Sequence, residues 1–204
     1  MTNVIKGLCI LLFALQSCKQ HSEENLLTSY AAKTTEGSIN AVIEIPSGTR
    51  QKWEINKKTG MLEWEQVAGK GRIVEYLGYP GNYGFIPKTL LSKDQGGDGD
   101  PLDVLVLGDP VSRGSVVPCK LIGVLHLQDR GELDDKLIAV AKNTSFYAIN
   151  TIEDLNENYP GVTTIIETWF TNYKGKGLMK SSGYGDTAAA TQILNEAILG
   201  FENQ

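Results

Sequence analysis

The pattern of apolar and polar positions between residues 40 and 141 predicts a domain built largely from β-strands. Short segments that alternate, or that are apolar throughout, recur here between turn residues. The expected strands are residues 40–46, 51–56, 61–65, 104–107, 114–127 and 133–141. The segments 51–56 and 61–65 are expected to pair as a hairpin across the turn at 57–60. The stretch 79–87, rich in aromatic residues and glycine, is expected to be a loop.

Helical spacing replaces this alternation after residue 150. A short helix is expected at 151–156 with Thr151 as its N-cap, a second at 162–173, and a last one that begins at Asp186 or Thr187. The apolar side chains expected on the buried sides of the two longer helices are Ile165, Ile166, Trp169, Phe170 and Tyr173, then Ala189, Ile193, Ala197 and Phe201. Strands first and helices last predict an α+β fold, with a β-barrel core flanked by mostly C-terminal helices.

The first 38 residues are expected to lie outside the folded domain. Residues 1–17 have a positive start and an apolar stretch too short to span a membrane comfortably, which is typical of a signal peptide. Residues 15–18, Leu-Gln-Ser-Cys, resemble a bacterial lipobox, and this resemblance implies cleavage before Cys18 and lipid on its sulfur. Residues 18–38 lack periodicity and are expected to form a tether, which leaves a single domain over 39–204.

The expected location is therefore outside the cytoplasm, with the protein exported and anchored by lipid to a bacterial membrane, either in the periplasm or at the surface. A plain secretory signal and the amphiphilic start of a cytoplasmic protein are the alternatives. The three cysteines fit the lipid anchor, because Cys9 lies in the signal, Cys18 would carry lipid and Cys119 is expected to be buried in a strand. No pair is then left for a disulfide, and no Cys and His spacing indicates zinc.

Composition limits the classes of partner. The chain has 204 residues, of which 41% are hydrophobic and 21% charged, and this is ordinary for a globular domain with its own core. The formal net charge of -5 argues against nucleic acid as a general partner, because binding to a phosphate backbone needs a basic face. A small anion held through bound metal ions is not excluded by this charge.

Three carboxylates lie within six residues at Asp98, Asp100 and Asp103, just before the apolar run 104–107. Crowded carboxylates raise one another's pKa unless a positive charge lies among them. Mg²⁺ or Ca²⁺ would supply that charge, since both ions prefer oxygen ligands. A polar turn before a strand, built from ordinary turn residues, is the alternative for this stretch taken alone.

Other charged and hydroxyl side chains occur where a fold alone would not require them. If the strands close into a barrel, these side chains would converge at one end of it and hold several Mg²⁺ ions together with a highly charged anion. Phosphoryl transfer needs this mixture, because cations neutralise phosphate oxygens and stabilise the leaving group. The candidates are Glu44, Glu54, Asp98, Asp100, Asp103, Asp129, Asp134, Lys52, Lys136, Lys174, Tyr79, Tyr83 and Tyr173.

These residues also occur in a characteristic order. Residues 98–104, Asp-Gly-Asp-Pro-Leu-Asp-Val, are similar to the D-G-D-P-x-D signature of the soluble family I inorganic pyrophosphatases. Further blocks resemble those of the family in the same order along residues 41–180. They are Glu44 within Val-Ile-Glu-Ile-Pro, then Lys52-Trp53-Glu54, Tyr79-Pro80-Gly81-Asn82-Tyr83-Gly84, Asp129 with Asp134-Asp135-Lys136, and Tyr173-Lys174.

The resemblance implies a closed five-stranded OB-like β-barrel and Mg²⁺-dependent hydrolysis of pyrophosphate to two orthophosphates by a metal-activated water, with Mn²⁺ or Co²⁺ as substitutes. It implies that Asp100 accepts a proton from that water, helped by Tyr83. The implied metal ligands are Glu44, Asp98, Asp103, Asp129 and Asp134, and the implied phosphate-binding residues are Lys52, Lys136, Tyr173 and Lys174. Glu54 and Tyr79 would line or support the site. The family forms hexamers or dimers, so a homo-oligomer is expected.

One position departs from the family pattern. The family has a phosphate-binding arginine shortly before the Tyr-Pro block, where direct register puts Glu65, and this chain carries an insertion around residues 67–78. Arg72 is the only arginine nearby and is expected to take the role, with a solvent-exposed Arg72 as the alternative. A metal-binding or diverged phosphohydrolase member of the family with an altered substrate therefore stays open.

Interpretations from other classes fit less well. Asp98-x-Asp100 resembles the start of an EF-hand Ca²⁺ loop, but Asp103 and Asp109 stand where that loop needs glycine and glutamate. A barrel that binds oligonucleotides is disfavoured by the acidic balance. His21 and His126 have no partner pattern and are expected to be non-catalytic.

Overall fold

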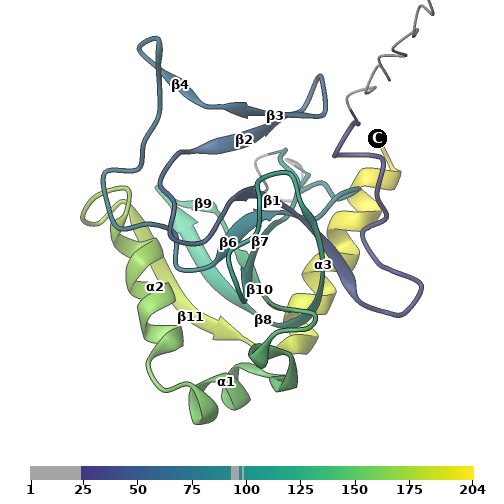
Figure 1. Ribbon diagram of the computed structural model, residues 1–204, viewed down its shortest axis with the longest axis vertical. Helices are drawn as coiled ribbons and strands as arrows, with labels where there is room; N and C mark the ends of the chain where they lie inside the picture. The colour runs from purple at the N-terminus through teal and green to yellow at the C-terminus, as the bar shows by residue number, and fades with distance from the viewer. Residues whose placement is uncertain (1–23, 93–96, 98) are drawn as a thin grey trace, which may run out of the picture.

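The computed structural model describes residues 24–92, 97 and 99–204, and it has the expected α+β class (Figure 1). The predicted signal peptide at 1–17, Cys18, His21 and Asp98 lie outside the described residues. The strands are β1 (Ile39–Ile45), β2 (Trp53–Asn56), β3 (Met61–Trp64), β4 (Gln66–Val67), β5 (Lys70–Gly71), β6 (Asn82–Phe85), β7 (Asp103–Leu107), β8 (Val116–Asp129), β9 (Glu132–Leu133), β10 (Lys136–Ala141) and β11 (Met179–Gly185). The helices are α1 (Ile152–Asn158), α2 (Val162–Asn172) and α3 (Thr187–Glu202), with a 3-10 turn, η2 (Ser145–Ala148).

The main sheet is mixed, and its pairings return to the strand on which they begin. β1, β6, β7, β10 and β8 follow one another by hydrogen-bonded pairing, and β8 also pairs with β1. The β7–β10 pair is parallel, and the other pairs of this ring are antiparallel. The long β8 additionally pairs with β9 and β11. The parallel pair places the first residues of β7 and β10 at the same end of the sheet.

Strand β7 shows why residues 104–107 are apolar at every position. All four side chains are buried, Val104 and Val106 in one apolar cluster and Leu105 and Leu107 in another. Successive side chains of a strand point to opposite faces, so a strand covered on both faces needs no polar alternation. Residues of α1 and α2 join the cluster of Leu105, and residues of α3 join that of Val104. The predicted buried strand is therefore confirmed.

The helices begin where the sequence indicates, but their buried sides differ in detail. The Thr151 hydroxyl accepts the Asp154 N–H at 3.0 Å at the start of α1, and Asp186 accepts a backbone N–H at the start of α3. Ile165, expected on the buried side of α2, is 61% exposed, so that expectation is wrong. The fully buried residues of α3 are Ala190, Leu194 and Ala197, whereas Ala189 and Ile193 are partly buried.

Four strands lie where the sequence predicts none: the two-residue β4 and β5, and the longer β6 and β11. β6 falls inside the predicted loop 79–87, and β11 follows the basic, glycine-rich segment 174–177. A Cβ at Gly84 would collide with the carbonyl oxygen of Val42, so this glycine lets the backbones of β1 and β6 approach each other. β11 contains serine and glycine, has little strand propensity of its own, and is held by its pairing with β8. The predicted strand 133–141 is divided into β9 and β10.

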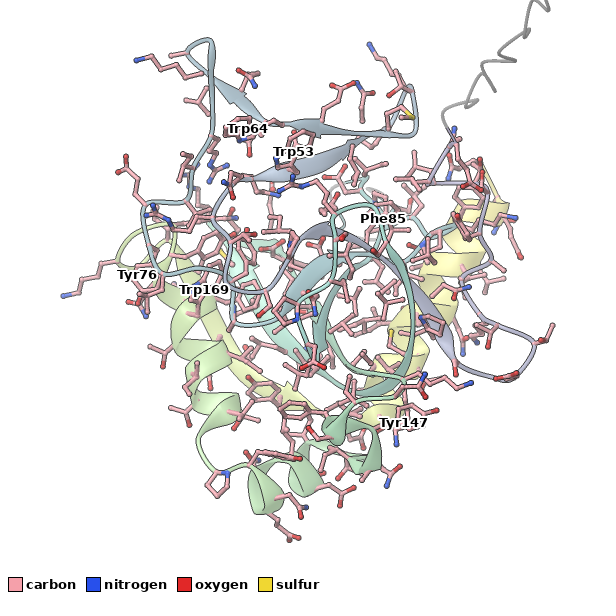
Figure 2. The ribbon with its side chains drawn as sticks, viewed as in Figure 1. Trp53, Trp64, Tyr76, Phe85, Tyr147 and Trp169 are labelled. Carbon is pink, nitrogen blue, oxygen red and sulfur yellow. The ribbon has the colours of Figure 1, made fainter. Side chains whose placement is uncertain are left out.

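Two hairpins, β2–β3 and β4–β5, pair outside the main sheet and lie at the top of Figure 1. The predicted hairpin across 57–60 is thus confirmed. Trp53 lies opposite Trp64 in β2–β3, and the two indoles stack with their centroids 6.1 Å apart (Figure 2). The guanidinium of Arg113 lies 4.3 Å from the Trp53 ring, so this stack ties the hairpin to the loop before β8.

The described part of the predicted tether contacts the domain. Leu26 donates its N–H to the carbonyl oxygen of Gly60 at 2.9 Å, and Lys88 donates its N–H to that of Leu27 at 2.9 Å. Ala32 is buried in the same apolar cluster as Val104. The sequence predicts that the domain begins at residue 39, but residues before that position already contact it.

Candidate active site

A pocket of about 400 Å³ opens where β7 and β10 begin. It gathers most of the predicted site residues, although they are spread over more than a hundred positions of the chain. Those that line it are Glu44, Lys52, Glu54, Arg72, Tyr83, Asp100, Asp103, Asp129, Asp134, Lys136, Tyr173 and Lys174. Asp98 and Cys18 lie outside the described residues, so the structure does not place them.

Lys136 is the buried centre of the site. Its Nζ donates to Asp103 Oδ2 at 2.5 Å and to Asp134 Oδ1 at 2.6 Å, and its side chain is only 2% exposed. The parallel register pairs Leu137 with Val104 and thereby sets Lys136 level with Asp103 on the neighbouring strand. Burial alone would lower the pKa of Lys136, but the two carboxylates outweigh it and raise that pKa above its usual range.

Lys174 and Asp129 extend this cluster. The Lys174 ammonium donates to Asp129 Oδ2 at 2.6 Å and lies 3.9 Å from Asp134 Oδ2, which is too far for a hydrogen bond. Burial opposes the charge on Lys174, but Tyr173 and the two carboxylates raise its pKa. Asp129 Oδ1 and Asp134 Oδ2 are buried and have no hydrogen-bond partner among the described residues.

Glu44 is a carboxyl group buried in strand β1. It is 4% exposed, and its Oε1 accepts the Ile55 N–H at 2.8 Å, which joins β1 to the β2–β3 hairpin. Burial raises the pKa of Glu44 to about 8, with a smaller raising effect from Asp103, although Lys52 opposes the shift. Glu44 is therefore a buried acid that faces the pocket.

Tyr83 and Tyr79 form the apolar side of the site. Tyr83 lies on β6 and lines the pocket, whereas Tyr79 packs behind it with ring centroids 5.1 Å apart. Tyr79 also packs on Trp169 at 4.3 Å, near the end of α2 that carries Tyr173. Burial raises the pKa of both Tyr79 and Tyr83 well above the usual value, so both phenols stay protonated at neutral pH.

Lys57 is a site residue that the sequence did not reveal. Its ammonium donates to the Asp100 carboxylate and, at 3.3 Å, to the carbonyl oxygen of Gly99. Lys57 stands in the turn of the β2–β3 hairpin, where a lysine is ordinary, and only the folded hairpin carries it to Asp100. Glu65 and Glu132 are further carboxylates on the pocket wall.

Arg72 lies beside Glu65, the residue that direct register puts at the family's arginine position. The β4–β5 hairpin occupies the six residues between them and brings Arg72 back beside Glu65. Arg72 Nη1 donates to both Glu65 oxygens at 2.9 Å, and both side chains line the pocket. Arg72 is therefore partly buried, with its side chain 34% exposed, and it lines the pocket, which disfavours the alternative of a solvent-exposed Arg72.

The described side chains fit a site for hard divalent cations. Eight carboxylates and five basic side chains line the pocket, so acids are in excess. The two buried oxygens without hydrogen bonds, on Asp129 and Asp134, are ligands of the kind that Mg²⁺ prefers. In the described ranges, no three His, Cys, Asp or Glu side chains gather into a metal cluster by themselves. The ammonium groups of Lys136 and Lys174 lie among the acids.

Two other predicted residues lie apart from the pocket. Cys119 is buried in β8 with its thiol 3.6 Å from the carbonyl oxygen of Ile39, as expected of a small apolar side chain. His126 Nδ1 lies 2.8 Å from Asp135 Oδ2, a partner that the sequence did not indicate. Asp135 also accepts the Leu127 N–H at 3.0 Å, so this pair braces β8 beside the site.

Comparison with known proteins points to one family for nearly all of the folded domain. The family model described as inorganic pyrophosphatase matches residues 41–202. The chain is 36% identical over 168 residues to an inorganic pyrophosphatase of Campylobacter jejuni, covering 80% of this chain and 92% of the relative. It is 37% identical over 172 residues to one of Rickettsia prowazekii, covering 82% and 94%. A solved inorganic pyrophosphatase of Helicobacter pylori superposes with a TM-score of 0.71 at 33% identity, covering 88% of this chain and 99% of that one.

Proposed function

The chain belongs to the inorganic pyrophosphatase family, and from that premise we propose that the acidic pocket is its active site. The protein is an enzyme that hydrolyses pyrophosphate to orthophosphate. The observation that carries the proposal is that the family match over 41–202 contains every pocket residue named above.

Glu44, Asp103, Asp129 and Asp134 are the described residues proposed to hold Mg²⁺, together with Asp98. The excess of carboxylates and the two buried oxygens without hydrogen bonds support this assignment. Mn²⁺ and Co²⁺ prefer similar ligands and are expected substitutes. When bound, the cations would neutralise charge on pyrophosphate and favour ionisation of the attacking water.

Asp100 is the proposed general base. Its carboxylate takes a proton from water while the water oxygen forms a bond to one phosphorus atom. The bond from that phosphorus to the bridging oxygen breaks at the same time, and the second phosphate leaves with the bridging oxygen. Tyr83, protonated at neutral pH because it is buried, would donate a hydrogen bond that orients the water.

The phosphate groups are proposed to be held by the cationic and hydroxyl side chains of the pocket. Ammonium and guanidinium groups form short, charge-assisted hydrogen bonds with phosphate oxygens. The residues assigned to this role are Lys52, Arg72, Lys136, Tyr173 and Lys174. Glu54 lines the same wall, and Tyr79 supports Tyr83 and Tyr173 from behind.

A phosphate-release assay with pyrophosphate and Mg²⁺ tests the function. Asp100→Asn is expected to lower kcat by about 10² or more, because a positioned base contributes on that order. Asp109→Asn, at an exposed aspartate beyond the far end of β7, is the matched control. Turnover retained in Asp100→Asn would exclude Asp100 as the base. Wild-type protein inactive with Mg²⁺, Mn²⁺ and Co²⁺ would refute the enzyme assignment.

Three further features of the protein are proposed from the family and the sequence. The ring of pairings through β1, β6, β7, β10 and β8 supports the closed OB-like barrel. A homo-oligomer is proposed because the family assembles in this way. Residues 1–17 are proposed to be a lipoprotein signal with Cys18 as the lipid anchor. Among the described residues, no helix is long and apolar enough to cross a membrane.

A further inference from the structure

Lys52, Glu65 and Arg72 are joined by a closed set of backbone hydrogen bonds. Lys52 donates its N–H to the carbonyl oxygen of Arg72 at 3.0 Å, Glu65 donates to that of Lys52 at 2.9 Å, and Arg72 donates to that of Glu65 at 2.7 Å. The indole of Trp64 adds a bond from its Nε1 to the carbonyl oxygen of Arg72 at 2.8 Å. The three backbone bonds therefore fix these pocket residues relative to one another, and the Trp64 side chain adds to them.

The side chains of Glu65 and Arg72 meet through a single guanidinium nitrogen. Arg72 Nη1 contacts both Glu65 oxygens at 2.9 Å, and the two side chains are 23% and 34% exposed at the pocket wall. A guanidinium carries five N–H donors. The donors on Nε and Nη2 have no hydrogen-bond partner within residues 24–92, 97 and 99–204. Arg72 is therefore held and still has free donors.

We propose that Glu65 is a positioning residue that holds Arg72 by one nitrogen and leaves the remaining N–H groups to bind a phosphate of the substrate. This inference rests on the proposed function, in which Arg72 contacts pyrophosphate. The pair of Glu65 and Arg72 forms because the β4–β5 hairpin turns the chain back, so that Arg72 lies across from Glu65.

Glu65 acts on a bound anion in two opposite ways. Paired with Arg72, it removes rotamer freedom from a long side chain, so less entropy is lost when the substrate binds. Without Arg72, it is a bare carboxylate on the pocket wall that repels pyrophosphate. The effect of neutralising Glu65 must therefore change sign when Arg72 is removed.

This sign change is measured with Glu65→Gln, Arg72→Met and the double variant, because Gln and Met keep the side-chain volumes. Arg72→Met is expected to lower kcat/KM for pyrophosphate about tenfold or more. Glu65→Gln in the wild-type background is expected to lower it about threefold to tenfold. In the Arg72→Met background, the same Glu65→Gln change is expected to raise it about threefold. Affinity for imidodiphosphate, measured by calorimetry, is expected to follow the same order.

The alternatives give different patterns. If Glu65→Gln lowers kcat/KM in both backgrounds, Glu65 is a structural residue, and if it raises kcat/KM in both, Glu65 competes with the substrate for Arg72. If kcat/KM changes in neither background, Glu65 has no role in the site. Each of these outcomes overturns the inference. Arg72→Met with wild-type kcat/KM would remove Arg72 from the site. An inactive wild type would instead refute the proposed function itself. Glu63→Gln, on the same hairpin but outside this pocket, is the matched control and is expected to leave kcat/KM unchanged.

Discussion

Glu44→Gln in metal-free protein tests the electrostatics of the site without relying on catalysis. Glutamine keeps the oxygen that accepts the Ile55 N–H at 2.8 Å and removes only the ionisation. In the folded protein the pKa of Glu44 is about 8, against 4.5 for the unfolded chain, because the carboxyl group is buried. Between these two pH values the folded state binds the extra proton, so the free energy of unfolding falls as pH rises.

The size of the effect follows from the difference between a pKa of about 8 for Glu44 in the folded protein and 4.5 in the unfolded chain. At about 1.36 kcal/mol for each unit, the wild type loses up to about 5 kcal/mol relative to Glu44→Gln between pH 4.5 and pH 8. Below this window both states are protonated, and above it both are ionised, so the difference becomes constant at each end. The loss approaches the whole stability of an ordinary domain, so it is large enough to measure.

Urea unfolding in EDTA, followed by tryptophan fluorescence at about pH 5, 6, 7 and 8.5, measures the difference directly. Glu44→Gln should be nearly as stable as wild type at pH 5 and clearly more stable at pH 8.5. Glu75→Gln, at an exposed glutamate, is the control and should show no such trend. A difference that stays within about 1 kcal/mol across this range would refute the buried, uncharged Glu44. Mg²⁺ at pH 8.5 should stabilise wild type more than Glu44→Gln if Glu44 helps to hold the ion.

The remaining predictions concern the pocket wall and the N-terminus. A Cβ at Gly71 would lie under 3.0 Å from the Trp64 indole. Gly71→Ala should therefore destabilise the protein by about 1–3 kcal/mol, and it should lower kcat/KM because the bond from Trp64 to Arg72 is lost. Unchanged stability and an unchanged near-UV circular dichroism spectrum would contradict this. Cys18→Ala should abolish incorporation of a labelled lipid precursor during expression in bacteria, and equal labelling of both proteins would refute the anchor at Cys18.

The sequence by itself determined the elements whose signals are local. The continuous apolar run 104–107 required a strand buried on both faces, and it is β7. Thr151 could be identified as an N-cap because capping depends on residues three positions apart. The order of the acidic and basic blocks identified the pocket residues, since twelve of the predicted side chains line one cavity. In these cases the structure could be predicted because the signal lies within a few neighbouring residues or in the identity of single residues.

The tertiary structure alone decided which distant groups meet. β11 has weak propensity and forms because β8 is long enough to pair with it, while β6 depends on Gly84 fitting against Val42. Lys57 reaches Asp100 only through the folded hairpin. The family's arginine position is the clearest case. Sequence register placed Glu65 at that position and left Arg72 seven residues away. The β4–β5 turn closes that separation by backbone hydrogen bonds, and no property of either residue alone could show that they share one wall of the site.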